Sequence, residues 1–295
     1  MKMEWIPAKS ILQNVKYGSS WFGISYNMNL YKGCCHGCIY CDSRSSCYQI
    51  EDFDVVRSKK DAILILEKEL RSKRRKGVIG IGAMSDTYNP FEKKYEITRR
   101  ALQLVMQYGF GVSIETKSDL VTRDIDLLVE IQKKADVILK FTITTAEDIL
   151  CQKIEPRVCP TSKRLEAMGK LSKAGVFVGT LLTPILPWIT DTQENIQKIV
   201  KLSYEHGAKF VFFMDGVTLR QNQRVYFYQQ LDKLFPGLKQ KYIQIYGESY
   251  LCRSTNTYLK KVFVETCKQY GLLYKMEDII KAYQTRGIEE QISLF

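Results

Sequence analysis

The chain has 295 residues and a mass of 34.2 kDa, which suits one barrel-sized domain with an extension, or two modest domains. Hydrophobic residues make up 45% of it and its mean hydropathy is −0.21. Because no long apolar run is present, the composition excludes a membrane-spanning class and indicates a globular protein. Residues 1–14 lack the pattern of a secretion signal, so we expect a cytoplasmic protein.

Two counts narrow the class of function. Lys and Arg total 44 against 32 Asp and Glu, a formal charge of +12, which favours polyanionic partners such as nucleic acid. The nine cysteines are an odd number. In a reducing compartment such cysteines serve as thiols and metal ligands, because disulfides rarely persist there.

Strand-like and helix-like segments alternate along residues 24–214. The helix-like segments carry apolar residues at three- and four-residue spacings, and the strand-like segments are short β-type runs. Such alternation predicts an α/β fold with six units, in which helices cover a parallel sheet. We expect strands near 24–31, 78–83, 111–116, 137–144, 176–182 and 210–214, and helices at 61–71, 92–108, 125–134, 161–173 and 192–206.

The alternation ends after Asp215, and a basic segment rich in aromatic residues follows. We therefore predict a first domain over 1–215, a helical extension over 216–289 and a tail over 290–295. Aromatic side chains among positive charges form stacking platforms for bases, whereas aromatics at helical spacing more often pack on the core. Of the two interpretations, packing is the one we expect for the aromatics of this segment: Tyr226, Phe227, Tyr228, Phe235, Tyr242, Tyr246, Tyr250 and Tyr258.

A loop after the first predicted strand carries Cys34, Cys38 and Cys41. Thiolates at this spacing can converge on one iron–sulfur cluster, while Gly33 and Gly37 allow the backbone to turn tightly. Three ligands leave one iron open to a cofactor or substrate. The alternative is a zinc ion held by the same cysteines with Cys35 or His36; structural zinc usually pairs two separated ligand groups, and the sequence has one.

The Cys-x3-Cys-x2-Cys loop, with the aromatic Tyr40 inside it, resembles that of the radical S-adenosylmethionine superfamily. The resemblance implies a four-iron four-sulfur cluster whose open iron binds S-adenosylmethionine, and a partial (β/α)6 TIM-type barrel that encloses the reaction at the carboxyl ends of its strands. It also implies that reduction releases a 5′-deoxyadenosyl radical, which abstracts hydrogen from a substrate.

Other stretches resemble the spore photoproduct lyase-like branch of that superfamily. They are Gly-Ala-Met-Ser-Asp-Thr-Tyr-Asn-Pro (82–90) with Glu-Lys-Lys-Tyr (92–95), Ser-Ile-Glu-Thr-Lys-Ser-Asp-Leu (113–120), Ile-Glu-Pro-Arg (154–157), Arg-Leu-Glu-Ala (164–167) and Tyr-Gly-Glu-Ser-Tyr (246–250). The resemblance assigns Ser85 and Asp86 to the amino group of S-adenosylmethionine, Lys117 to its carboxylate and Thr144 to its carboxylate or ribose, with Arg157 supporting that region.

Two positions depart from spore photoproduct lyase proper. Ala83 stands where that enzyme has a hydrogen-donating cysteine, and Asp42 stands where it has a tyrosine of its radical relay. An alanine cannot donate the hydrogen atom, so reversal of a dimer lesion requires another donor. The candidates are Cys47, Cys151, Cys159 and Tyr88.

The last five residues, Gln-Ile-Ser-Leu-Phe (291–295), resemble the pentapeptide by which bacterial DNA repair and replication proteins bind the sliding clamp. That resemblance implies that Leu294 and Phe295 enter an apolar pocket while Gln291 hydrogen-bonds at its rim. A tail folded back onto the barrel is the alternative.

Together these features predict a radical S-adenosylmethionine enzyme that acts on DNA, with lesion repair as the expected reaction and the sliding clamp and an electron donor such as flavodoxin or ferredoxin as partners. Two alternatives stay open. One is radical chemistry on RNA, a peptide or a small metabolite. The other is a non-catalytic, clamp-associated DNA-binding module with a structural metal site.

Overall fold

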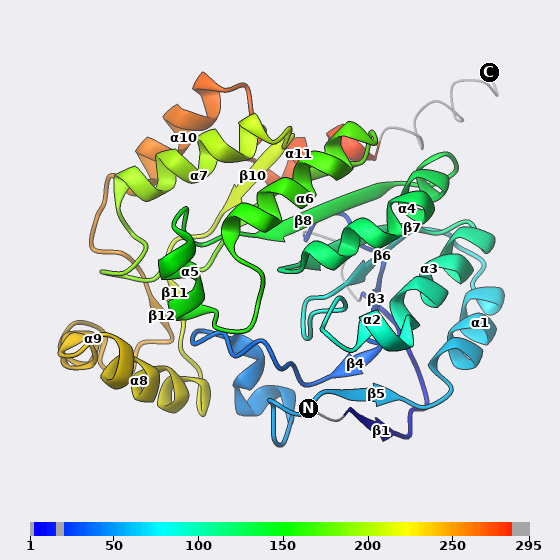
Figure 1. Cartoon of the computed structure of the whole chain (residues 1–295), viewed down its shortest axis with the longest axis horizontal. Coiled ribbons are helices and arrows are strands. Elements are labelled where there is room, and N and C mark those ends of the chain that lie inside the picture. The colour runs from blue at the N-terminus through cyan, green and yellow to red at the C-terminus, as the bar shows by residue number, and fades with distance from the viewer. Residues whose placement is uncertain (1–2, 16–20, 285–295) are drawn as a thin grey trace.

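A seven-stranded sheet forms the centre of the protein. In the computed structural model, which describes residues 3–15 and 21–284, the strand order is β10-β9-β8-β7-β6-β3-β2. All neighbours from β3 to β10 are parallel, and β2 pairs antiparallel with β3. The six parallel strands confirm the predicted α/β fold and curve into a partial barrel (Figure 1). The strands are β2 Leu12–Asn14, β3 Tyr26–Met28, β6 Val78–Ile81, β7 Gly111–Thr116, β8 Val137–Thr142, β9 Phe177–Leu182 and β10 Phe210–Phe213.

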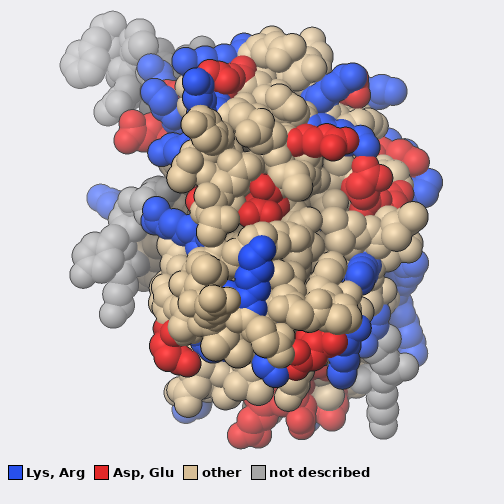
Figure 2. Space-filling view, turned by 90° about the vertical axis from the view of Figure 1, so that its left-hand side faces the viewer, with Lys and Arg blue, Asp and Glu red and all other residues tan. Residues whose placement is uncertain are grey.

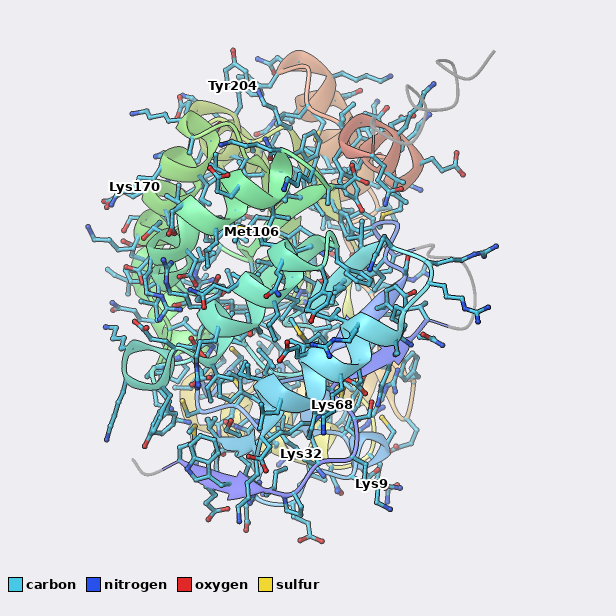
Figure 3. The ribbon with its side chains drawn as sticks, turned by 90° about the vertical axis from the view of Figure 1, so that its right-hand side faces the viewer. Lys9, Lys32, Lys68, Met106, Lys170 and Tyr204 are labelled. Atoms are coloured by element: carbon cyan, nitrogen blue, oxygen red, sulfur yellow. The ribbon has the colours of Figure 1, made fainter. Side chains whose placement is uncertain are left out.

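Amphipathic helices cover the outer side of the barrel (Figure 1). On α3, for example, Ala101, Leu102 and Val105 are buried against the sheet, as the three- and four-residue spacing predicts. Lysines such as Lys68 on α1 and Lys170 on α6 extend from the opposite face of their helices (Figure 3). The covering helices are α1 Ala62–Ser72, α3 Ile97–Gln107, α4 Ile125–Gln132, α6 Thr161–Lys173 and α7 Gln193–Glu205.

Some elements differ from the sequence prediction. The helix expected over 92–108 is divided into α2 Glu92–Tyr95 and α3, because Glu96 has a φ of 47° and ends the first helix. A small sheet of β1 Glu4–Ile6, β5 Arg57–Lys59 and β4 Tyr31–Lys32 was not expected. Strands of two or three residues are too short to show a period of two. The helix α5 Asp148–Ile154 and two short 3-10 helices, Asp42–Arg44 and Ser46–Tyr48, were also not expected.

The segment after the barrel is helical, as predicted, and contains α8 Gln223–Leu234, α9 Leu238–Tyr246, α10 Leu259–Gln269 and α11 Met276–Tyr283. A short antiparallel pair, β11 Val217–Thr218 and β12 Leu251–Cys252, connects its two halves. Phe227 and Tyr242 pack on the loop that carries the clustered cysteines, whereas Tyr250 and Tyr258 are 50% and 63% exposed. The aromatics therefore divide between core packing and the surface.

The last two helices return to the barrel. Helix α10 packs on α7, and Ile279 and Tyr283 of α11 share an apolar cluster with Phe22 and Phe210 at the foot of the barrel. Because this part of the extension packs on the barrel, the domain boundary after residue 215 stays a prediction. The tail lies outside the described residues.

Two surface properties follow from the described residues. On the face shown in Figure 2, basic and acidic side chains are interspersed, so the charge of +12 is not gathered into one patch there. None of the helices in residues 3–15 and 21–284 is both long and apolar enough to cross a bilayer.

Candidate active site

A cavity of about 430 Å³ opens at the carboxyl ends of the parallel strands. Its wall includes the loop with the clustered cysteines and the residues that end four successive strands. These are Ser85 and Asp86 after β6, Glu115 to Lys117 at β7, Thr142 at β8 and Leu181 at β9. In a parallel barrel the strand ends converge at one rim, which is where side chains from distant parts of the chain can act together.

The cysteine loop presents three thiols to this cavity. Cys34, Cys38 and Cys41 line it, whereas Cys35 packs in the main core. Gly33 and Gly37 have φ values of +77° and +73°, in the left-handed region that favours glycine. A Cβ atom on Gly33 would lie 2.3 Å from the backbone oxygen of Val55, so the loop requires glycine there on two grounds.

The donor set fits an iron–sulfur cluster. Three cysteine side chains line one cavity, and a four-iron cluster takes its thiolates from separate corners of a cube. Burial raises the pKa of Cys34 to about 12 and that of Cys38 well above its usual range. Thiolate ligands are deprotonated, so binding of iron has to release these protons.

Ser85 and Asp86 form hydrogen bonds that connect the segments of the cavity wall. The Ser85 hydroxyl donates to the backbone carbonyl of Gly33, which joins the end of β6 to the cysteine loop. The Asp86 carboxylate accepts hydrogen bonds from the hydroxyl of Thr116 at 2.8 Å and the backbone N–H of Lys117 at 2.8 Å. The imidazole of His36 lies 3.7 Å from the same carboxylate.

Lys117 lines the cavity with its ammonium 5.9 Å from the ring of Tyr40. Burial lowers the pKa of this lysine, but the neighbouring Cys38, Glu155 and Asp86 outweigh burial, so its pKa lies above the usual value. Lys117 therefore stays a cation, as binding of a carboxylate requires.

The structure brings some predicted residues to the cavity and leaves others away from it. Thr142, not Thr144, lines the cavity at the end of β8, because the strand ends at Thr142 and the chain turns away before Thr144. Thr144 is buried, and its hydroxyl has no hydrogen-bond partner in the described part of the chain. Arg157 supports the cysteine loop instead, by donating to the backbone carbonyl of Cys35 and pairing with Asp54.

Tyr40 lines the cavity, as expected of a cofactor-site residue, and its hydroxyl joins a buried network behind the cysteine loop. Its hydroxyl donates to the carboxylate of Glu155, which also accepts from Arg164 and from the Cys151 thiol. Glu155 and Arg164 have fully buried side chains. The network fixes the aromatic ring between two cysteines of the loop.

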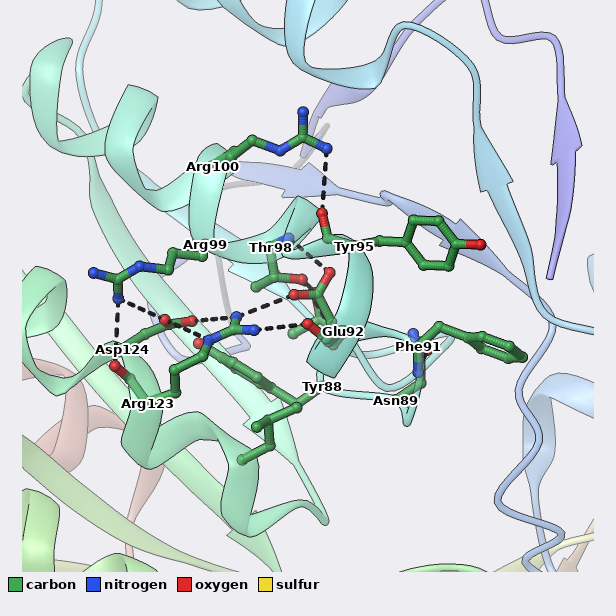
Figure 4. A network of polar contacts seen from close by, with 12 residues as sticks. Tyr88, Asn89, Phe91, Glu92, Tyr95, Thr98, Arg99, Arg100, Arg123 and Asp124 are labelled. Atoms are coloured by element: carbon green, nitrogen blue, oxygen red, sulfur yellow. Dashed lines mark hydrogen bonds and ion pairs between the residues drawn. The ribbon is translucent and has the colours of Figure 1, made fainter. Parts of the chain in front are cut away.

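Three of the suggested hydrogen donors lie away from the cavity wall. Tyr88 is 1% exposed and lies in the network of Figure 4, where Arg123 bridges Glu92 and Asp124. The carboxylates of Glu92 and Asp124 can be buried because Arg123 pairs with both of them. Cys151 is buried beside Glu155, and the Cys159 thiol donates to the backbone carbonyl of Lys117.

The fourth suggested donor lies beside the cavity mouth. Cys47 is exposed, and its sulfur accepts from Arg220 at 3.0 Å. Asp42, Ser43 and Tyr48, which precede and follow Cys47 in the sequence, all line the cavity. Cys47 therefore belongs to a segment of the cavity wall. The predicted clamp-binding residues Gln291, Leu294 and Phe295 lie outside the described residues.

The sequence profile of the radical SAM superfamily matches residues 28–202, the segment that holds the cysteine loop and the four parallel strands β6 to β9. The chain belongs to the radical SAM superfamily. This radical SAM enzyme uses a four-iron four-sulfur cluster and S-adenosylmethionine. When bound, the cluster supplies the electron that breaks a carbon–sulfur bond of S-adenosylmethionine.

Several proteins of unassigned activity are similar to this radical SAM enzyme in sequence. An uncharacterised protein of Mycobacterium tuberculosis is 26% identical over 255 residues, which cover 84% of this chain and 75% of that one. An uncharacterised protein of Acidianus two-tailed virus is 29% identical over 265 residues, which cover 83% and 80% of the two chains.

Solved structures of spore photoproduct lyase have the same fold. A variant of that lyase superposes with a TM-score of 0.68 at 14% identity, over 90% of this chain and 79% of that one. The lyase complexed with dinucleoside spore photoproduct gives a TM-score of 0.66 at 14% identity and the same coverage. At 14% sequence identity, the similarity to these structures establishes a shared fold and nothing about the reaction.

All six expected residues line one cavity, and we infer that Cys34, Cys38 and Cys41 would hold the cluster while Ser85, Asp86 and Lys117 would bind S-adenosylmethionine. Sequence reasoning missed five further residues at or beside the cavity: Trp21, Tyr48, Glu115, Thr142 and Arg220. Glu115 lies within a stretch that resembles the family, but the sequence does not indicate which side chains an acidic residue in a strand will contact. The other four lie outside any recognisable motif.

Proposed function

We propose that this radical SAM enzyme acts on DNA and that its reaction is a lesion repair of the kind carried out by spore photoproduct lyase. The proposal rests on one observation: an arginine lies between two tyrosines at the mouth of the cavity. Arg220 donates to the Tyr250 hydroxyl at 2.8 Å, and both Tyr250 and Tyr48 line the cavity.

The geometry of this mouth suits a single strand of nucleic acid. The Arg220 guanidinium lies 5.1 Å from the centre of the Tyr250 ring and 5.9 Å from that of Tyr48. Aromatic rings stack on bases, and a guanidinium binds phosphate oxygens with two parallel hydrogen bonds. Arg44 contacts the ring of Tyr226 on helix α8 at 3.9 Å, but its side chain is 9% exposed and paired with Asp54, so Arg220 is the arginine of the mouth.

The mouth is coupled to the cysteine loop. Asp42, the residue after Cys41, accepts a hydrogen bond from the Tyr48 hydroxyl at 2.8 Å and lies 3.3 Å from the Nε atom of Arg220. A strand held at the mouth would thus lie next to the segment that carries the last ligand of the cluster.

The decisive experiment measures the hydrogen that is transferred. The protein is loaded with iron and sulfide without oxygen, reduced with dithionite, and given S-adenosylmethionine with ultraviolet-irradiated DNA deuterated on carbon. We expect deuterium in the released 5′-deoxyadenosine, and no release from Cys41→Ala. Arg220→Ala should weaken the DNA-dependent release by about tenfold and leave the DNA-independent release unchanged.

Absence of deuterium from every DNA, combined with transfer from deuterated RNA, peptide or small metabolites, would overturn the DNA assignment in favour of the alternative substrate class. The non-catalytic alternative requires that the loaded protein release no 5′-deoxyadenosine under any of these conditions.

The proposal includes recruitment to the sliding clamp through residues 291–295, supported by the sequence of that segment alone. It also includes a cytoplasmic location and reduction by a flavodoxin or ferredoxin.

The clamp proposal is tested by binding to purified clamp. We expect the full chain to bind, the variant with Leu294 and Phe295 changed to alanine not to bind, and the matched control Ser293→Ala to bind like the wild type. Equal binding by all three proteins would exclude the clamp proposal.

A further inference from the structure

The floor of the cavity holds a carboxylate that none of the expected cofactor contacts uses. Glu115, on β7, lines the cavity with its side chain 16% exposed. Ser113 and Glu115 are two residues apart on β7 and therefore project to the same side of the sheet. Lys140 of the neighbouring strand β8 pairs directly with Glu115 in the sheet register and bonds both side chains.

One oxygen of this carboxylate is saturated. The Oε1 atom of Glu115 accepts from the indole N–H of Trp21 at 2.7 Å and from the Lys140 ammonium at 3.0 Å. Lys140 is 1% exposed and also donates to the Ser113 hydroxyl at 2.7 Å. The indole is fixed by edge-to-face contacts with Phe22 and Phe212, whose ring centres lie 5.2 Å and 5.4 Å away.

Both hydrogen bonds of the carboxylate go to Oε1, so within residues 3–15 and 21–284 the other oxygen, Oε2, has no protein donor, and the side chain is partly exposed to the cavity. A carboxylate oxygen accepts hydrogen bonds and cannot donate one. Its charge is already compensated by the buried ammonium of Lys140, so the site has no excess negative charge to offer a cation. The ligand that suits it is therefore a neutral N–H or O–H donor.

The surroundings of Glu115 narrow the donor further. Trp21, Leu181 and Met214 line the same cavity and give it apolar walls. Enzymes that act on a base extruded from a strand hold it between aromatic or apolar side chains and bind its Watson–Crick edge by hydrogen bonds. Thymine and guanine carry a ring N–H on that edge, whereas cytosine and adenine carry a ring nitrogen that accepts.

We propose that the free oxygen of Glu115 accepts a hydrogen bond from the ring N–H of a thymine or guanine base, so that Glu115 determines which base enters the barrel. Trp21 and Lys140 are positioning residues, because they hold the carboxylate through its other oxygen. This inference rests on the proposed function, since it requires a nucleic-acid substrate.

The test uses two single-stranded oligonucleotides that differ at one base, thymine in one and 5-methylcytosine in the other. They match in size and methyl group, but the second presents an acceptor where the first presents the ring N–H. Binding is measured without oxygen by fluorescence anisotropy, on the full chain loaded with cluster and S-adenosylmethionine. We expect wild-type protein to bind thymine about tenfold more tightly or better, as for a hydrogen bond to a charged group.

Variants separate recognition from support of the fold. Glu115→Gln leaves the Lys140 ammonium buried without a counter-charge, so the informative protein is the double variant Glu115→Gln with Lys140→Met, in which both charges are absent. It should lose the preference for thymine, because the Trp21 N–H holds the amide oxygen and turns the NH2 group, a donor, to the cavity. Lys140→Met alone should keep the preference because the carboxylate remains. The dissociation constant for S-adenosylmethionine should change less than twofold in either protein.

The possible results distinguish failure of the Glu115 inference from failure of the DNA proposal. A wild-type protein that binds both oligonucleotides equally overturns this inference and leaves the DNA proposal standing, and it requires no variant to fold. A wild-type protein that binds neither overturns both. A double variant that keeps the thymine preference, or that loses S-adenosylmethionine and oligonucleotide to the same extent, shows that Glu115 does not select the base.

Discussion

The phenol of Tyr40, inside the cysteine loop, donates a hydrogen bond to the carboxylate of Glu155, which lies 115 positions further along the chain. The same carboxylate forms a fully buried ion pair with Arg164. One acidic side chain thus connects the loop that would hold the cluster to helix α6. Its removal should affect the stability of the whole barrel as well as the order of the loop.

We predict that Glu155→Gln lowers the free energy of unfolding by about 3–5 kcal/mol, because it leaves the charge of Arg164 buried without a partner. Urea denaturation of both proteins measures the difference. Glu166→Gln is the matched control: its partner Lys163 lies on the same helix, but both side chains are about half exposed, so its unfolding curve should overlie that of the wild type. Equal losses in the two variants would show that burial of the pair is not the cause.

The contribution of Glu155 should depend on pH. Burial raises the pKa of this carboxyl, but Arg164 and Lys117 outweigh burial and hold it below its usual value of 4.5. The unfolded chain therefore binds the proton more readily, and the stabilisation is complete above the unfolded pKa and lost as the pH falls through the folded one. The stability gap between wild type and Glu155→Gln should be constant near neutral pH and shrink below about pH 4. A gap that stays constant into acid would contradict the assignment.

Gly33 should be irreplaceable for the cluster. Gly33→Ala places a Cβ atom 2.3 Å from a backbone oxygen in addition to the strain of the left-handed conformation. Gly175 has a similar φ of +85° with no atom within 4 Å of the added Cβ, so Gly175→Ala isolates the strain alone, about 1–2 kcal/mol. We expect Gly33→Ala to lose most of its bound iron and Gly175→Ala to keep it, as measured by iron and sulfide content per chain. Similar iron content in the two would rule out a role for the close contact.

We predict that Cys34 and the adjacent Cys35 differ in their effect on the iron content of the loaded protein. Cys34 lines the cavity, whereas Cys35 packs in the core. Cys34→Ala should abolish the brown colour and bound iron of protein loaded without oxygen, while Cys35→Ala keeps both and loses about 1 kcal/mol of stability from a small cavity. Colourless wild-type protein with one equivalent of zinc would support the structural-metal alternative instead.

The α/β fold and the cysteine loop could be predicted because their signals are local. A helix of the barrel shows its buried face at spacings of three and four residues, and Cys34, Cys38 and Cys41 are close enough in sequence that any fold keeps them together. Glycine at positions 33 and 37 is a local signal too, since the left-handed conformation it permits belongs to a single residue.

Pairings between distant residues could not be predicted in this way. The pairing of Glu115 with Lys140 depends on the register of β7 and β8, and the choice of Thr142 over Thr144 depends on the residue at which β8 ends. The buried carboxylate of Glu92 is paired with Arg123, which reaches it from a different segment. Periodicity records which face of an element is apolar, but it does not record which polar groups face each other across a packed interior, and that was decided only by the tertiary structure.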